Sequence, residues 1–152
     1  MTVNIKVPST YAEWVEIFNI LKAKTDDEAI LSTMKQGTIE WQSGVAERFT
    51  KRLVDVVNYR MNIATDRFQK EITRSNGEER VIVQSLLALR KELNFLAQAM
   101  NLPVIPEKDR QQYCNLVREQ ANSIQQSLED SAKKDRSGKL SSIIRNNKVN
   151  TF

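Results

Sequence analysis

The side chains best suited to chemistry in this chain are three groups of adjacent carboxylates and a set of arginines and lysines. The carboxylate groups are Asp26-Asp27-Glu28, Glu78-Glu79 and Glu129-Asp130. Paired carboxylates can transfer protons or bind Mg²⁺. The chain has no histidine, however, and histidine is the side chain most often used for proton transfer near neutral pH. Ser-His and Cys-His nucleophile pairs are therefore excluded.

Metal and cofactor sites are not expected either. A zinc site would have Cys114 as its one cysteine and no histidine, and the di-iron sites of helical bundles need two Glu-x-x-His pairs. Neither glycine-rich phosphate loop, G-x-x-x-x-G-K or G-x-G-x-x-G, occurs in the chain. The first two carboxylate groups fall where helices are predicted to begin, and negative charge is favourable there for electrostatic reasons alone. We predict a protein that is not an enzyme, with no catalytic residue, cofactor or metal.

Positive charge is concentrated at the end of the chain. Residues 133–152 contain six Lys or Arg and one Asp, whereas residues 1–132 contain 17 Lys or Arg and 18 Asp or Glu. The six basic residues are Lys133, Lys134, Arg136, Lys139, Arg145 and Lys148. A basic end on a near-neutral body is typical of proteins that bind phosphate backbones or acidic proteins.

Apolar residues such as Leu140 and Ile143 are interleaved with these charges. Four alternatives stay open for residues 133–152. The segment folds back on the body, pairs with the N-terminal arm, inserts into a partner as a short motif, or is an exposed tail that only adds solubility.

A second basic feature lies in the middle of the chain. Residues 48–74 contain seven Lys or Arg and three Asp or Glu. Arg60, Arg67 and Arg74 are seven residues apart, so on a helix each lies within about 20° of the previous one. They would form a ridge that a groove-facing helix presents to nucleic acid. The alternative, and the commoner use of such residues, is that they pair with acidic residues of neighbouring helices.

Glycines, prolines and capping residues predict where the helices begin and end. Ser9 or Thr10 with Glu13 resembles a capping box, and Gly37 is expected to end the second helix in the left-handed conformation. Residues 3–7 alternate apolar and polar residues, as a short strand or an extended arm would. The predicted helices are 11–23, a short helix capped by Asp26 or Thr25 and ended by Gly37, 39–74 with Gly44 as the place for a kink, 78–101, and one from Pro106 that fades between Ser131 and Gly138.

Apolar spacing predicts how these helices are used. Between residues 46 and 72 apolar residues recur about every 3.7 residues, which indicates a nearly straight bundle helix. The helix over 78–101 has a wider apolar stripe and is therefore either central or an oligomer contact. Both tryptophans, Trp14 and Trp41, are expected as core residues or as fillers between helices. The Gln-rich patch that includes Gln125 and Gln126 is expected to be a solvated helix face.

The predicted fold class is all-α: an antiparallel helical bundle with three long helices, one or two short N-terminal helices, and an extended basic C-terminal tail. The predicted domains are a helical bundle over 1–132 and the tail over 133–152. Removing the tail is therefore expected to leave the helical signal and the melting temperature nearly unchanged.

The leading hypothesis is a non-enzymatic binding or adaptor protein whose bundle and basic tail engage a macromolecular partner, with DNA or RNA tested first and an acidic protein next. The alternative is an oligomeric structural or assembly subunit, such as a homodimer, that binds only proteins. No stretch approaches the ~18 apolar residues of a membrane helix, and no signal peptide is evident, so a cytoplasmic location without a membrane partner is expected. The predicted partner-binding residues are Arg60, Arg67, Arg74, Lys133, Lys134, Arg136, Lys139, Arg145 and Lys148.

Overall fold

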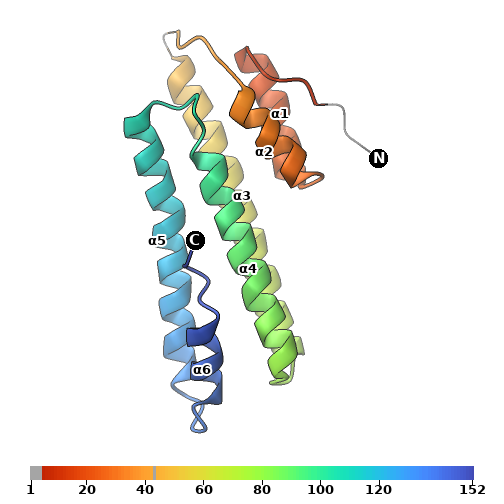
Figure 1. The fold of residues 1–152 in the computed structure, drawn as a ribbon, viewed down its shortest axis with the longest axis vertical. Helices are drawn as coiled ribbons and strands as arrows, with labels where there is room; N and C mark the ends of the chain where they lie inside the picture. Colours follow the sequence, from red (N-terminus) through yellow and green to blue (C-terminus); the bar gives the residue numbers. More distant parts are fainter. Residues whose placement is uncertain (1–4, 43) are drawn as a thin grey trace. The chain divides into compact units, whose positions relative to one another are not determined.

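The computed structural model in Figure 1 describes residues 5–42 and 44–152. Over these residues the chain forms six α-helices and no strand, which confirms the all-α class. The helices are α1 (Tyr11–Ala23), α2 (Asp27–Gln36), α3 (Val45–Arg74), α4 (Glu79–Met100), α5 (Glu107–Ala132) and α6 (Lys139–Asn146). Residues 3 and 4 of the predicted strand or arm lie outside the described residues, and residues 5–7 are neither helix nor strand.

The chain forms two compact units. The first unit is Met1–Arg60 with Gln98–Cys114, and the second unit is Met61–Ala97 with Asn115–Phe152. Helices α1 and α2 belong to the first unit and α6 to the second, while α3, α4 and α5 each contribute a part to both. The division into a domain over 1–132 and a tail over 133–152 stays a prediction, since the structure groups residues 133–152 with parts of these longer helices.

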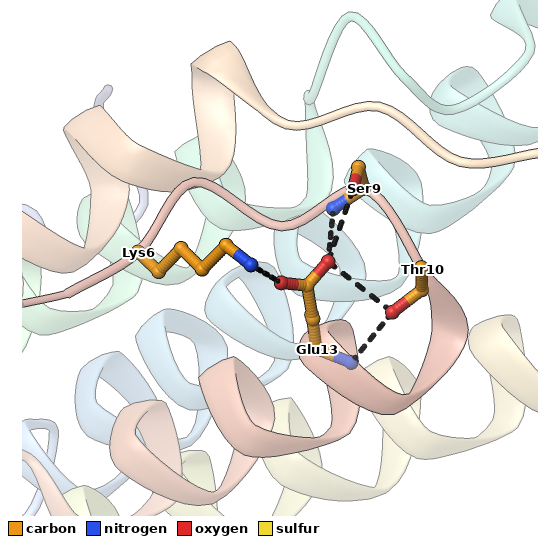
Figure 2. A network of polar contacts seen from close by, with 4 residues as sticks. All are labelled: Lys6, Ser9, Thr10 and Glu13. Carbon is orange, nitrogen blue, oxygen red and sulfur yellow. Dashed lines mark hydrogen bonds and ion pairs between the residues drawn. The ribbon is translucent and has the colours of Figure 1, made fainter.

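The start of α1 has the capping box that the sequence predicts. Thr10 is the N-cap residue, and its hydroxyl accepts a hydrogen bond from the Glu13 amide at 3.2 Å. The Glu13 carboxylate in turn accepts from the Ser9 amide at 3.1 Å and pairs with the Lys6 ammonium at 2.7 Å, as Figure 2 shows. The hydrogen bond from Lys6, followed by those from Ser9, lowers the pKa of Glu13 to about 2. This network fixes the residues that lead into α1.

Replacing Glu13 with Gln is expected to change how stability depends on acid pH. The folded pKa of about 2 lies below the ordinary value of 4.5, so the stability that Glu13 contributes is present above about pH 4.5 and is lost as the pH falls toward 2. Denaturant unfolding midpoints measured between pH 2 and 5 should therefore vary less for Glu13→Gln than for the wild type. Glu16→Gln, an exposed change on the same helix, is the control and should keep the wild-type dependence.

The core of the first unit is built around an aromatic cluster. Trp14 and Phe18 on α1 are buried and meet Phe49 of α3 edge-on, with ring centroids 5.0 and 5.1 Å away. The Trp14 indole N–H donates to the Thr38 carbonyl at 2.8 Å, so its polar atom is satisfied. Trp41 differs from expectation because it is 39% exposed, although its ring makes an edge contact with Phe49 of the cluster at 5.3 Å.

Two glycines act differently from the prediction. Gly37 follows α2 with φ −67°, an extended conformation open to any residue, so the left-handed stop predicted there is wrong. Gly37 lies instead against the rings of Trp14 and Pro8, and a Cβ atom at this position would overlap the Trp14 ring. Gly44 has φ +83° directly before α3, so the helix predicted from residue 39 with a kink at Gly44 begins only at Val45.

A tight turn connects α3 to α4 in the second unit. Asn76 and Gly77 both have positive φ in this turn, 52° and 80°. Across the turn, the Ser85 hydroxyl of α4 donates to the Glu71 carboxylate of α3 at 3.0 Å. Buried apolar side chains in this unit come from all four helices, and include Phe68, Ile82, Leu86, Leu89, Val117, Ala121, Ile143 and Ile144.

Candidate nucleic-acid interface

The net positive charge of the chain lies entirely in the second unit. The first unit contains 10 Lys or Arg and 10 Asp or Glu, whereas the second contains 13 and 9. The whole-chain charge of +4 is therefore the charge of the second unit. Because electrostatic attraction of a polyanion depends on how charge is distributed over the surface, a binding surface is expected in this unit.

The turn that leads into α6 is organised by Asp135. Its carboxylate accepts hydrogen bonds from the Leu140 amide at 3.0 Å, the Ser137 amide at 3.2 Å and the Ser137 hydroxyl at 2.9 Å. The bond from Leu140 is the largest cause of a lowered Asp135 pKa, and those from Ser137 follow. Gly138, the N-cap residue, has no side chain to cap the helix, so Asp135 serves in its place. The one carboxylate of the basic segment, defined as residues 133–148, is thus occupied by backbone and hydroxyl groups.

Helix α6 has one apolar and one polar face. Ile143 and Ile144 are buried and Leu140 is half-buried, whereas Lys139, Ser142, Arg145 and Asn146 are exposed. The extended conformation predicted for residues 133–152 is therefore wrong over 139–146. The alternation of apolar and basic residues instead forms an amphipathic helix whose apolar side is covered.

The chain after α6 docks on α5, as Figure 1 shows for the blue end of the chain. Val149 is fully buried, and its amide donates to the side-chain oxygen of Gln125 at 3.0 Å. Gln125 itself is only 4% exposed and donates through its amide nitrogen to Glu129. A second bond runs from the Asn150 side chain to Asn122 at 2.9 Å. Of the alternatives left open by the sequence, these contacts agree with a segment that folds back on the body.

Docking leaves every basic side chain of the segment exposed. Lys133 lies 3.6 Å from Asp130 and Lys139 lies 3.6 Å from Glu79, and both pairs are exposed ion pairs of small energetic value. Within the described part of the chain, the other four basic residues are in no ion pair: Lys134, Arg136, Arg145 and Lys148. The basic segment therefore presents cationic groups that are largely uncompensated.

Arg60 is not a surface residue, contrary to its predicted place on an exposed ridge. It is 3% exposed, and its guanidinium forms a two-pronged ion pair with Asp27 at 2.9 and 2.8 Å. It also donates to the Leu21 carbonyl at the end of α1, at 3.1 Å. Arg60 thus connects α3 to the end of α1 and the start of α2, which is the packing role that the sequence left as the alternative.

Arg67 and Arg74 are exposed on the part of α3 that belongs to the second unit. They border a shallow, open depression of about 450 Å³ on this helix. The other residues around it are Ile63, Asp66, Lys70 and Glu71. Because two carboxylates stand among three cations, this surface is less suited to a polyanion than the basic segment is.

The carboxylate groups have structural partners. Asp26 caps α2 by accepting from the Ala29 amide at 3.2 Å, and Asp27 holds Arg60. Glu79 and Asp130 pair with lysines, and Glu129 accepts from Gln125. Among residues 5–42 and 44–152, no group of three or more His, Cys, Asp or Glu side chains is placed to hold a metal ion.

The solvated face predicted for the Gln-rich patch is wrong at Gln125, which is 4% exposed, and the sequence carries a signal for this burial. Gln125 lies four residues after Ala121 and eight after Val117, on the buried stripe of α5. A polar residue on the buried side of a helix requires a hydrogen-bond partner, and here that partner comes from the end of the chain. Gln126, one residue further, is exposed as predicted.

Comparison with known proteins adds no family to this description, because no protein-family model, curated protein or solved structure matches the chain. None of the helices in the described part of the chain combines the length and apolar character needed to cross a lipid bilayer.

Proposed function

We propose that this protein is a non-enzymatic, cytoplasmic binding protein whose second unit engages a macromolecular polyanion, DNA or RNA, through the basic segment. One observation carries the proposal: six exposed Lys and Arg side chains lie on a segment that buried Ile143, Ile144 and Val149 hold on the protein. Residues 136–152 contain no Asp or Glu. Arg67 and Arg74 are secondary contact candidates.

The physical basis of such binding is the release of counterions from the phosphate chain. Each phosphate neutralised by a lysine or arginine makes the logarithm of the affinity depend more steeply on the logarithm of salt concentration, by about 0.9 for duplex DNA. Exposed hydroxyl and amide groups of the segment, on Ser142 and Asn146, can add hydrogen bonds to phosphate oxygens. Contacts of this kind position a nucleic acid without selecting its sequence.

Neutralising three exposed cations tests the proposal without disturbing the docking of α6. The variant Lys133→Gln with Lys134→Gln and Arg136→Gln should bind fluorescent DNA and RNA oligonucleotides at least tenfold more weakly at low salt. Its salt dependence should also be less steep by about 2 to 3 units of slope, since up to three phosphate contacts are removed. Fluorescence anisotropy over a salt series measures both quantities.

The matched control removes three exposed lysines of the first unit, with Lys35→Gln, Lys51→Gln and Lys108→Gln. It changes the net charge by the same amount and should keep most of the affinity. Equal weakening of both triple variants would mean that only total charge matters, and an absence of any binding by the wild type would reject the nucleic-acid proposal.

A second candidate function is an oligomeric assembly subunit. Leu87 on α4 is 42% exposed, in the stripe that the sequence offered as an oligomer contact. Light scattering on the same samples distinguishes the two functions. A stable oligomer that is lost in Leu87→Lys and does not bind oligonucleotides would favour the assembly subunit.

A further inference from the structure

A hydrogen bond within a mostly apolar environment holds the end of the chain on α5. Gln125 is a buried polar residue on an otherwise apolar stripe, and the group that it satisfies is the buried backbone amide of Val149, 24 residues away. Since a buried amide without an acceptor is strongly unfavourable, Gln125 favours the docked conformation over an undocked one. Lys139, Arg145 and Lys148 lie in the stretch of chain between the end of α5 and this hydrogen bond.

We infer that Gln125 is the positioning residue of the polyanion-binding surface: the partner binds the docked form of residues 139–150, so that binding and docking stabilise each other. This inference rests on the proposed function and concerns how the same surface is held in its binding conformation. In the docked form, α6 presents Lys139 and Arg145 on its outer side, with Lys148 just beyond it. An undocked segment would have to become ordered when the partner binds. The free-energy cost of that ordering would lower the affinity.

Thermodynamic linkage gives this inference a quantitative consequence. If docking raises the affinity for a polyanion by some factor, the bound polyanion must favour docking by the same factor. A saturating oligonucleotide should therefore slow hydrogen exchange of the amides between Ile143 and Val149 in the wild type, by about threefold or more. A role of Gln125 in stability alone would not make docking respond to the ligand.

A matched pair of variants isolates the hydrogen bond to Val149. Gln125 and Gln126 each donate to a carboxylate four residues on, Glu129 and Asp130, but only Gln125 accepts from Val149. Gln125→Leu should therefore speed exchange of the Val149 amide by about tenfold, whereas Gln126→Leu should leave it unchanged.

Affinity is then compared in full-length proteins that carry the same charges. Gln125→Leu combined with Ile144→Ser depopulates the docked form from both the polar and the apolar side, and should bind a fluorescent oligonucleotide about fivefold more weakly or worse. Circular dichroism shows whether the double variant is folded. If it is not, Ile144→Ser alone, which is measured in parallel, provides the comparison. Gln126→Leu should bind like the wild type.

Two results would overturn the inference while leaving the proposed function intact. One is a folded variant that binds the oligonucleotide as tightly as the wild type although its hydrogen exchange shows that the segment is undocked. The segment would then bind as a flexible arm. The other is an oligonucleotide that binds without slowing exchange at Val149. Failure of the wild type to bind any oligonucleotide would instead remove the proposed function and this inference together, although the exchange rates would still report whether Gln125 holds the segment.

Discussion

Asp27→Ala is expected to destabilise the protein more than Arg60→Met, although both variants remove the same ion pair. We expect the free energy of unfolding to fall by about 3 kcal/mol for Asp27→Ala and by about 1 kcal/mol for Arg60→Met. The asymmetry follows from burial. The Arg60 side chain is 2% exposed, whereas that of Asp27 is 29% exposed.

Removing Asp27 takes the two-pronged carboxylate away from a guanidinium that water cannot reach. The Leu21 carbonyl still accepts from Arg60, but the buried guanidinium loses the opposite charge of Asp27. Removing the charge of Arg60 leaves a carboxylate that water can solvate, and methionine fills much of the volume of the arginine stem. The more exposed partner is therefore the costlier one to remove.

Urea unfolding followed by circular dichroism measures both changes. Glu28→Ala is the control, because Glu28 is an exposed carboxylate beside Asp27 on α2, and its removal should shift stability by no more than about 0.5 kcal/mol. Equal losses for Asp27→Ala and Arg60→Met would show that the pair acts as a surface ion pair and that Arg60 is solvated in solution.

Ending the chain at Ala132 is expected to lower the melting temperature by about 10 °C. This reverses the expectation drawn from the sequence, which treated residues 133–152 as dispensable for stability. The deletion removes the buried side chains of Ile143, Ile144 and Val149, and burial of an aliphatic side chain contributes about 1.5 to 3 kcal/mol before the cost of ordering the chain. It also leaves Gln125 without the Val149 amide and exposes apolar surface of the second unit.

Calorimetry or thermal circular dichroism measures the effect. The triple variant Lys133→Gln, Lys134→Gln and Arg136→Gln separates charge from packing, since it keeps all the buried residues and should melt like the wild type. An unchanged melting temperature for the truncated chain would mean that α6 is not docked in solution, and the basic segment would then be the extended tail that the sequence predicts.

The boundaries of the helices were largely predictable because they depend on neighbouring residues. The capping box at Thr10 and Glu13 starts α1 at Tyr11, and Pro106 directly precedes α5. Asp26 caps α2, and the acidic residues at the start of α4 are where the sequence placed them. Each of these signals acts within about one helical turn, so the order of residues is sufficient to reveal it.

The candidate surface was predictable only in part. The concentration of basic residues over 133–148 follows from counting charges, and their exposure agrees with it. Arg60 has the same seven-residue spacing as Arg67 and Arg74 but also follows Val57 by three residues, on the apolar side of α3. Its position therefore fits both the predicted arginine ridge and the buried side of α3, and the ion pair with Asp27 shows that it is buried.

The sequence by itself therefore determined the all-helical class, the positions of most helix ends and the location of the positive charge, because propensity, capping and composition are local properties. The tertiary structure decided which polar residues are buried and what the end of the chain contacts. Gly37 faces Trp14, Asp27 holds Arg60, and Gln125 accepts from Val149 across 24 residues. Such pairings join residues distant in the chain, and their energies depend on burial that exists only after the helices have packed.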